Sequence, residues 1–538
     1  MNNRDTNSLK RVIKETITSY KIESFIVLVL IIVSSVANVY GSMFLKSLID
    51  DYIVPLLSQT VPNYVPLLNA LMKLVMIYGV GILATYGFNR IMVTISLGTL
   101  KHIRDELFEH MQTLPLRYFD THAHGDIMSV YTNDTDTLRQ LISQSIPQVI
   151  VSLMTIISVT ISMFILNVPL AVLTIACGLL MVYTSKKISA KSGKYFIAQQ
   201  KQLGVENGFI EEMMEGSKVI KVFTHEEQSI KDFDQVNDAL FEASANANTF
   251  ANVLMPIVMN IGYISYVLVA VVGSIFALNH IAGLTLGGIA AFLQLNRSFT
   301  NPIGQISMQL NAVIMADAGA KRIYEIIDTE SEVDDGVVTL EQIDHDHWAW
   351  HHPRKNGQDE LVPLRGDVRF ENVNFSYNPD KQILFDVSLF AKPGQKIAFV
   401  GATGAGKTTI TNLINRFYDI QSGSITYDGI DVKLIKKADL RKSLGIVLQD
   451  TNLFTGTIMD NIRYGRLDAS DEECIAASKL SNAHEFIKHL EHGYDTMIHA
   501  GGESLSQGQR QLLSIARAAV ANPPVLILDE TMKLYGRN

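Results

Sequence analysis

The chain has 538 residues, of which 47% are hydrophobic and only 18% are charged, below the roughly 25% charged content of soluble domains. Its net charge of −9 argues against a nucleic-acid partner, because nucleic-acid-binding domains usually carry a clustered basic excess. Two cysteines, Cys177 and Cys474, disfavour a disulfide framework.

The first 320 residues have the pattern of a membrane domain. A charge at the bilayer centre costs ~3 kcal/mol, and the stretches 24–45, 140–185 and 243–296 contain no charged side chain. The last two are too long for single helices, and each contains a break, at 166–171 and 278–285. We therefore expect about six membrane-spanning helices.

The placement of lysine and arginine predicts how these helices are oriented. Three segments are rich in charge: the N-terminal residues 1–23, residues 101–139 and residues 186–242. The loops around Asp50, Asn167 and Asn279 contain no lysine or arginine. Because positive loops stay in the cytoplasm, we expect a multi-pass protein of the cell membrane with both termini cytoplasmic. The inner segments are longer than hairpins require, which predicts helices that extend beyond the bilayer.

Residues 321–365 are predicted to form a polar linker with a histidine-rich insertion. The insertion contains four histidines: His345, His347, His351 and His352. Their spacing matches no closed zinc site, so a surface insertion is favoured over a metal cluster. From Gly366 onward, short apolar strands alternate with Gly-rich turns and amphipathic helices, which predicts an α/β domain over residues 366–538.

The strongest motif is a G-x-x-x-x-G-K-T loop at residues 401–408, and we expect an apolar strand, Ile397–Val400, before it and a helix after it. Glycines allow backbone N–H groups to close around phosphate oxygens, and a helix N-terminus favours anions. In such a loop Lys407 contacts the β- and γ-phosphates, and the Thr408 hydroxyl binds Mg²⁺. The predicted nucleotide-contacting residues are Gly401, Thr403, Gly404, Ala405, Gly406, Lys407, Thr408 and Thr409.

A second motif is the apolar strand Val525–Leu528, which is followed by Asp529 and Glu530. Wholly apolar strands of this kind are typical of buried parallel sheets. Asp529 is placed to orient the water shell of the metal ion, and Glu530 to polarise the attacking water as a general base. An ordinary strand end is the alternative, and the phosphate loop upstream makes it less favoured.

Between these motifs, residues 505–509 read Leu-Ser-Gln-Gly-Gln and open a helix. Alone, this stretch is a capped helix whose small-residue start suits an anion. Together, the motifs resemble one subunit of an ABC exporter, with an all-α six-helix transmembrane domain followed by an α/β P-loop ABC nucleotide-binding domain. The segment 505–509 then resembles the family's signature, Gln449 its Q-loop glutamine, and Tyr377 the aromatic that stacks on adenine.

Two further segments strengthen the resemblance. Residues 114–129 and 207–223 resemble the intracellular loops that end in coupling helices. The Trp-Ala-Trp-His-His-Pro stretch at 348–353 resembles one partner of bacterial heterodimeric multidrug exporters.

The resemblance implies an ATPase in which two subunits sandwich ATP and Mg²⁺ between their nucleotide-binding domains. One subunit supplies the P-loop with Gln449, Asp529 and Glu530, and the other supplies Ser506, Gly508 and Gln509. Glu530 and Gln449 are the expected catalytic residues, while Thr408, Gln449 and Asp529 hold the metal. The implied function is ATP-driven export of amphipathic, multidrug-like or lipid-like compounds by a hetero- or homodimer.

Residues 531–538 depart from this pattern. They match neither the small-residue loop nor the switch histidine that follow the acidic pair in the family. We therefore expect a nucleotide-binding domain truncated after its acidic strand, with weak stability and poor ATP hydrolysis. The alternative function is a subunit that binds nucleotide without turnover, while the site of its partner performs hydrolysis.

Overall fold

The computed structural model of the chain contains two compact units. The residues that it describes are 8–57, 59, 61–279, 281–344, 347–353, 359–402, 404–448, 451–502 and 504–529. The first unit comprises Met1–Gln112 and His124–Thr329, and the second comprises Thr113–Ala123 and Glu330–Asn538.

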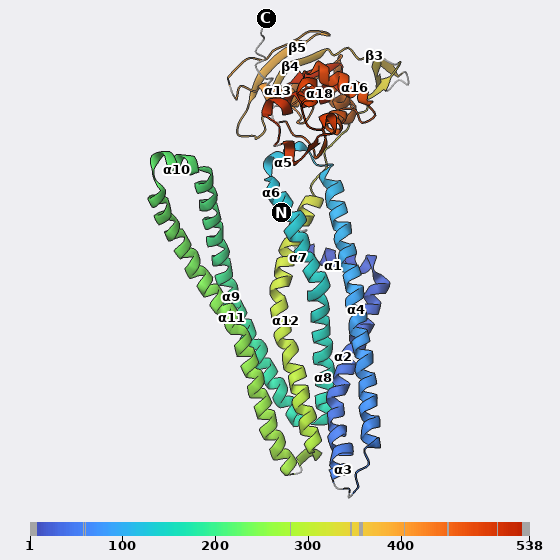
Figure 1. Cartoon of the computed structure of the whole chain (residues 1–538), viewed down its shortest axis with the longest axis vertical. Coiled ribbons are helices and arrows are strands. Elements are labelled where there is room, and N and C mark those ends of the chain that lie inside the picture. Colours follow the sequence, from blue (N-terminus) through green and yellow to red (C-terminus); the bar gives the residue numbers. More distant parts are fainter. Residues whose placement is uncertain are drawn as a thin grey trace. The chain divides into compact units, whose positions relative to one another are not determined.

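The first unit is built from long helices (Figure 1). Among the described residues, five helical segments are long and apolar enough to cross a membrane: Lys21–Leu57, Val65–Met111, His124–Leu166, Val168–Glu215 and Glu226–Leu278. Their main helices are α2 (Lys21–Ser47), α4 (Val65–Met111), α8 (Ile146–Leu166), α9 (Val168–Glu215) and α11 (Glu226–Leu278). The other α-helices described in this unit are α1 (Ser8–Ser19), α3 (Val54–Leu57), α6 (His124–Ser129), α7 (Thr135–Gln140), α10 (Ser217–Phe223) and α12 (Leu286–Ile327). A helical transmembrane region, as predicted, is therefore confirmed.

Both predicted breaks between membrane helices are confirmed. Asn167 is extended, with φ of −163°, and its side chain accepts a hydrogen bond from the Leu170 backbone N–H at 3.1 Å, which caps α9. The second break separates α11 from α12, and there the Thr285 hydroxyl accepts from the Gly288 N–H at 3.0 Å. Polar caps satisfy the free N–H groups where each chain reversal starts a new helix.

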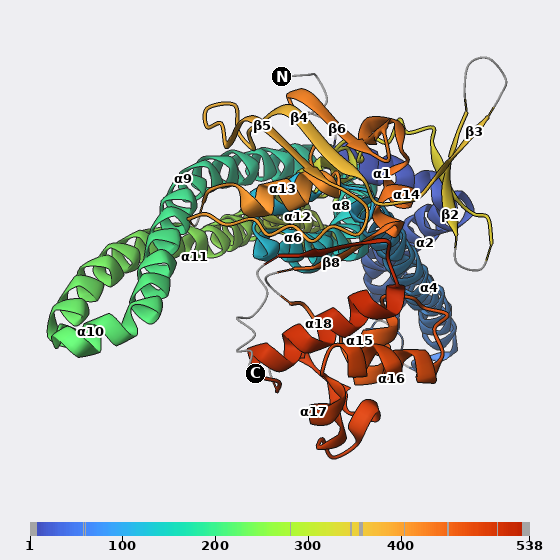
Figure 2. The same cartoon turned by 90° about the horizontal axis from the view of Figure 1, so that it is seen from above.

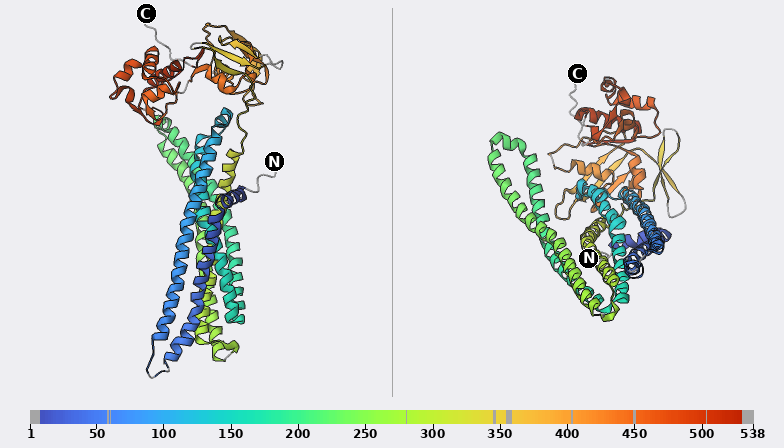
Figure 3. Two further views of the ribbon diagram at one scale, coloured as in Figure 1. Left: turned by 90° about the vertical axis from the view of Figure 1, so that its right-hand side faces the viewer. Right: turned by 60° about the horizontal axis from the view of Figure 1, so that its bottom comes forward.

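The helices α9 and α11 extend beyond what a bilayer requires. They have 48 and 53 residues, and at about 1.5 Å per residue each is more than twice the ~30 Å of a hydrocarbon core. They run side by side and are joined through α10 (Figures 1 and 3). The prediction of helices that continue past the membrane is confirmed.

The helix α12 packs in one buried core with α8, α9 and α11 but is less apolar than the five segments above. One buried apolar cluster of this unit consists of Val39, Val159, Met163, Leu170, Ala171, Met181, Val258, Val269, Leu284, Phe292, Leu295, Phe299 and Ile303. Although α12 contributes four of them, Phe292, Leu295, Phe299 and Ile303, it is outside the five apolar segments found among the described residues. The predicted count of six spans is therefore not confirmed by length and composition, and α12 as a sixth span stays a prediction.

The second unit contains two groups of elements (Figure 2). In the first, an antiparallel sheet in the order β5-β4-β6-β7 lies beside α13. Its elements are β4 (Val368–Phe375), β5 (Leu384–Ala391), β6 (Ser422–Tyr427), β7 (Ile430–Asp431), α13 (Lys407–Ile414) and α14 (Lys437–Lys442). The second group is mainly helical, with α15 (Ile458–Arg463), α16 (Asp471–Leu480), α17 (His484–Lys488), α18 (Gln507–Ala521), β9 (Gly456–Thr457) and β10 (Met497–Ile498). Each group has its own buried apolar core.

The histidine-rich insertion contains a small sheet. Its strands are β1 (Thr339–Gln342), β2 (Trp348–His352) and β3 (Glu360–Pro363), all antiparallel. Trp350 is fully buried against Tyr427, with ring centroids 5.4 Å apart, and its indole N–H donates to Asp428 Oδ2 at 3.2 Å. The indole is thus a buried polar group with its hydrogen bond satisfied. Sequence reasoning missed this connection to the domain core. Within the described ranges, no group of three or more His, Cys, Asp or Glu side chains is placed to hold a metal ion.

A short parallel sheet joins the two motif-bearing regions of the second unit. The strand β11 (Val525–Leu528) pairs in parallel with β8 (Leu444–Val447), so the apolar strand predicted before Asp529 is confirmed. The predicted strand Ile397–Val400 is wrong, because this segment has no strand conformation and Val400 is 94% exposed. A strand requires a hydrogen-bonded neighbour, and among the described strands β11 pairs only with β8.

Candidate functional site

The loop at residues 401–408 turns sharply into α13. Gly404 and Gly406 have φ of 84° and 88°, a region that glycine adopts easily and other residues rarely. At Gly406 a Cβ would also lie 2.7 Å from Leu384 Cδ2, so the loop packs closely on β5. The loop leads directly to the N-terminus of α13, whose first N–H groups have no partner within the helix. This is the geometry of an anion-binding loop.

The Lys407 side chain folds back over the same loop. Its ammonium group donates to the carbonyl oxygens of Gly401 at 2.8 Å and Ala402 at 3.0 Å. The backbone N–H of Ala405 also donates to the Ala402 carbonyl at 3.1 Å. These bonds hold a positive charge beside the loop backbone, where it can attract a bound phosphate.

The structure brings Thr408 and Asp529 together. The Thr408 hydroxyl donates to Asp529 Oδ1 at 3.1 Å, although the residues are 121 positions apart in sequence. Asp529 is only 7% exposed, and among the described residues its carboxylate forms no ion pair. A buried carboxylate without a cation is costly, and hydroxyl and carboxylate oxygens are ligands that Mg²⁺ prefers. These two residues therefore fit a magnesium ion beside the phosphate loop.

Three predicted site residues, Thr403, Gln449 and Glu530, lie outside the described residues. The strands that precede Gln449 and Glu530 are nevertheless paired with each other in register. Val447 of β8 pairs with Leu528 of β11, and the Asp529 N–H donates to the Val447 carbonyl at 2.9 Å. Carboxyl ends of neighbouring parallel strands are the usual location of ligand sites in such sheets.

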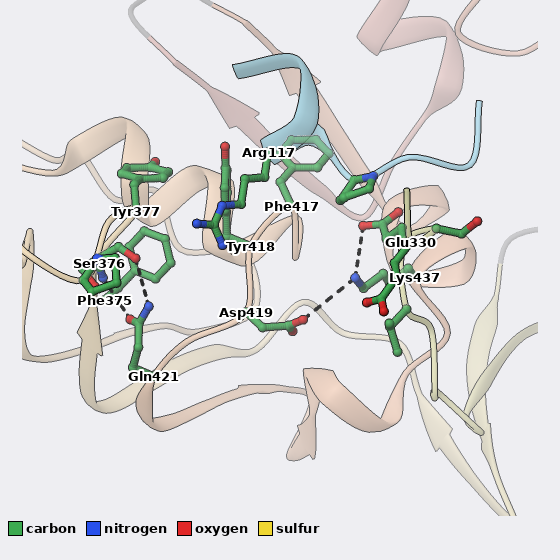
Figure 4. A pocket seen from close by; sticks show the side chains of 15 residues that line it. Arg117, Glu330, Phe375, Ser376, Tyr377, Phe417, Tyr418, Asp419, Gln421 and Lys437 are labelled. Atoms are coloured by element: carbon green, nitrogen blue, oxygen red, sulfur yellow. Dashed lines mark hydrogen bonds and ion pairs between the residues drawn. The ribbon is translucent and has the colours of Figure 1, made fainter. Parts of the chain in front are cut away.

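Tyr377, labelled in Figure 4, contacts α13, the helix that follows the phosphate loop. Its hydroxyl donates to Thr409 Oγ1 at 3.4 Å and accepts from Asn412 Nδ2 at 3.2 Å, so it is anchored to α13. Its ring meets Phe375 and Tyr418 edge-on, with centroids 4.9 and 4.8 Å apart. Thr409 is buried. The predicted stacking of Tyr377 on adenine stays a prediction.

The segment around Ser506 begins α18 with a reciprocal cap. Ser506 Oγ accepts from the Gln509 N–H at 3.3 Å, and Gln509 Oε1 accepts from the Ser506 N–H at 2.8 Å. Farther along the helix, burial lowers the pKa of Arg517, and its guanidinium donates to Asn461 O at 2.9 Å and to Asn461 Oδ1 at 3.0 Å. These contacts fix the helix while leaving Ser506 exposed at its tip.

The capped segment and the phosphate loop are not joined within this chain. In the part of the chain that the structure describes, no hydrogen bond or ion pair connects Ser506, Gly508 or Gln509 with residues of the loop. They belong to the two different groups of the second unit, with α13 beside the β4–β6 sheet and α18 beside α15 and α16 (Figure 2). The loop and the acidic strand therefore form one cluster, and the capped segment stands apart from it.

A pocket of about 500 Å³ adjoins Tyr377 and was not predicted from the sequence (Figure 4). On one side, Tyr418 donates a hydrogen bond to Asp120 of the short helix α5 (Leu116–Thr121). Burial, followed by this bond, raises the pKa of Tyr418. Tyr418 and Asp120 are 298 residues apart in the sequence, so no local pattern could have revealed their contact.

The opposite wall of the pocket is charged. Lys437 Nζ donates to Glu332 Oε1 at 3.1 Å, and Arg441 Nη2 donates to the same oxygen at 2.6 Å. Burial raises the pKa of Glu332, but the bonds from Arg441 and Lys437 outweigh it, so its pKa lies below the ordinary value. The residue stays ionised and ties the start of the second unit to α14.

Comparisons with known proteins match both units. The pattern of the ABC transporter transmembrane region covers residues 24–303, and that of the ABC transporter covers residues 384–533. An uncharacterized ABC transporter ATP-binding protein of Bacillus subtilis is 37% identical over 98% of this chain and 83% of its own length. A fatty acid ABC transporter ATP-binding/permease protein of Mycobacterium bovis is 35% identical over 80% of this chain and 65% of its own. A candidate multidrug export ATP-binding/permease protein of Bacillus subtilis is 33% identical over 80% and 71%.

Proposed function

Because the chain belongs to the ABC transporters that fuse a transmembrane region to an ATP-binding domain, we propose that it is one subunit of a dimeric, ATP-driven exporter of amphipathic compounds. The ATP-dependent part of this proposal rests on the contact between Thr408 and Asp529 beside the loop that holds Lys407. It brings a phosphate-binding loop and a metal-binding carboxylate to one place. This is the arrangement that phosphoryl transfer requires.

Mg²⁺ bound at Thr408 and Asp529 would neutralise charge that develops on the phosphates. Lys407 binds the same phosphates, and the loop glycines let backbone N–H groups approach them. Glu530, which directly follows Asp529 in the sequence, accepts a proton from the attacking water, and Gln449 helps to position that water and the metal. All these groups come from one chain.

A second subunit, either another copy or a related chain, completes the site. Among the described residues, Ser506, Gly508 and Gln509 form no hydrogen bond or ion pair with this chain's own phosphate loop, and Ser506 is exposed. A capped helix start that presents free N–H groups suits the γ-phosphate of ATP bound to a partner. ATP then acts as part of the interface between two nucleotide-binding domains.

The coupling element to the partner is α10 at the tip of α9 and α11. Its apolar side chains Val219, Val222 and Phe223 are 60%, 77% and 65% exposed. Exposed apolar patches of this kind are typical of protein interfaces. We assign this patch to the ATP-binding domain of the second subunit, so that closure of the ATP sites moves the membrane helices.

The membrane part fits a multi-pass protein of the cell membrane with both termini in the cytoplasm and α12 as the sixth span. The loops at Asn167 and Asn279 lack lysine and arginine, whereas the segments that lead to the second unit are charged. The names of two relatives specify fatty acids and multidrug export. Both are amphipathic cargo classes, and this supports a small amphipathic substrate here.

The proposed function predicts ATP-dependent transport in inside-out vesicles. The chain, reconstituted with any subunit that co-purifies with it, is expected to concentrate a fluorescent amphiphile inside the vesicles when Mg²⁺ and ATP are supplied outside. Replacing ATP by ADP provides the matched control. Accumulation that is equal with ADP, or absent in vesicles that hydrolyse ATP, would contradict export of amphipathic compounds.

A further inference from the structure

Arg297 in α12 is an isolated charge in the membrane part of the chain. It is the only Asp, Glu, Lys or Arg between Glu242 and Asp317. It lies eleven residues beyond Leu286, the first residue of α12, which corresponds to about 16 Å along the helix axis. If α12 starts at one surface of the bilayer, this depth is about half of the ~30 Å hydrocarbon core. The side chain is too deep to reach the surface easily, so the charge requires a local reason.

Among the residues that the structure describes, Arg297 has an aromatic partner but no acidic one. The guanidinium carbon lies 5.4 Å from the centroid of the Tyr266 ring of α11, within the range of a cation–π contact. Within the described residues Arg297 forms no ion pair, and its side chain is exposed. A cation–π contact orients the guanidinium but leaves its charge without a counter-ion.

Arg297 also belongs to a polar face of α12. Gln294, Arg297, Asn301 and Gln305 are all exposed, and their spacing of three and four residues places them on one side of the helix. Gln305 accepts a hydrogen bond from Gln148 of α8 at 2.7 Å. Polar residues within membrane helices usually line a water-filled path or the interior of a bundle, since contact with lipid is costly.

The opposite face of α12 is anchored in the core. Asn296 is fully buried, and its amide donates to Ser265 Oγ at 2.8 Å and Thr174 Oγ1 at 3.4 Å. Ser265 immediately precedes Tyr266, so this cluster fixes α12 against α11 just where Arg297 meets Tyr266. The cluster fixes the helix from which Arg297 extends on the exposed side.

We propose that Arg297, oriented by Tyr266, binds the anionic headgroup of an amphipathic cargo molecule as it passes along the polar face of α12. The headgroup is a carboxylate or a phosphate, and either can accept two parallel N–H bonds from the guanidinium. The apolar tail remains against the surrounding membrane helices. This inference rests on the proposed function and narrows its substrate class to anionic amphiphiles.

The test measures equilibrium binding of three probes with the same chain length to the whole protein in lipid nanodiscs: dodecanoate, dodecyl phosphate and 1-dodecanol. Arg297→Gln is expected to weaken binding of at least one of the two anions about tenfold or more, while 1-dodecanol binding is unchanged. The anion whose binding is weakened more by Arg297→Gln identifies the headgroup. Arg297→Lys should retain more affinity for the anions than Arg297→Gln, because the positive charge remains although the two parallel N–H bonds are lost. Arg90→Gln, which removes an exposed cation from α4, is the matched control. It should leave the affinity for all three probes unchanged.

Two results would overturn the anion site. Equal weakening of the anions and of 1-dodecanol by Arg297→Gln would show a role in packing only. Unchanged binding of all three probes would show that Arg297 does not contact the headgroup. If the unaltered protein binds ATP but none of the three amphiphiles, the proposed cargo class fails as well, which separates failure of the function from failure of this site.

Discussion

Lys407→Ala is expected to weaken ATP binding about 100-fold or more. The ammonium group is held beside the phosphate loop by the Gly401 and Ala402 carbonyls, and its removal leaves the β- and γ-phosphates without their nearest positive charge. Equilibrium binding of a fluorescent ATP analogue to the purified protein measures this effect. Folding of the variant is checked by its thermal unfolding midpoint, which should be close to that of the parent.

Lys396→Ala is the matched control for this variant. Lys396 is an exposed lysine in the segment leading to the same loop. Its loss should leave ATP affinity within about twofold, because interactions of exposed charges are weak. Equal affinities in the parent and in Lys407→Ala would contradict the assignment of residues 401–408 as the phosphate loop.

Glu530→Gln is expected to lower the turnover of ATP by about 10²- to 10⁴-fold while ATP affinity is retained. The amide keeps the size of the side chain but cannot accept the proton of the attacking water, and general-base catalysis contributes a factor of this order. Release of inorganic phosphate by the assembled transporter, measured with saturating ATP and Mg²⁺, reports turnover. The same ATP analogue reports binding.

This substitution also separates the exporter from the alternative of a nucleotide-binding subunit without turnover. If phosphate release by the assembled pair does not change in Glu530→Gln, hydrolysis occurs at a site that uses another glutamate. Lys407→Ala provides the comparison, because it should reduce binding and turnover together. A loss of ATP binding in Glu530→Gln would assign that residue to the structure of the site and not to catalysis.

Much of the candidate site follows from local sequence because its geometry is local. The positive φ angles of Gly404 and Gly406 and the cap between Ser506 and Gln509 depend on residues within a few positions of each other. The contact between Thr408 and Asp529 is distant in sequence, but two motifs of known chemistry predicted it. The helix breaks near Asn167 and Thr285 follow from polar caps between apolar runs.

Other features depend on tertiary contacts that no local pattern encodes. The segment Ile397–Val400 has the composition of a buried strand, yet strand formation also needs a paired neighbour. Burial of Trp350 on Tyr427 depends on the sheet packed beneath the insertion. The hydrogen bond between Asp120 and Tyr418 joins residues that are 298 positions apart in the sequence. The polar face of α12 could have been read from its helical spacing, but the aromatic partner of Arg297 could not.

The most direct test of the shared ATP site is a cross-link from the exposed Ser504, next to the capped start of α18. A photoreactive benzoylphenylalanine at this position, activated in the assembled transporter, is expected to give a product with the mass of two chains. Its yield should rise with ATP, and mass spectrometry should locate the bond in the phosphate-loop region of the second subunit. An ATP-dependent bond between position 504 and residues 401–409 of the same chain, without a two-chain product, would contradict a site completed by a partner.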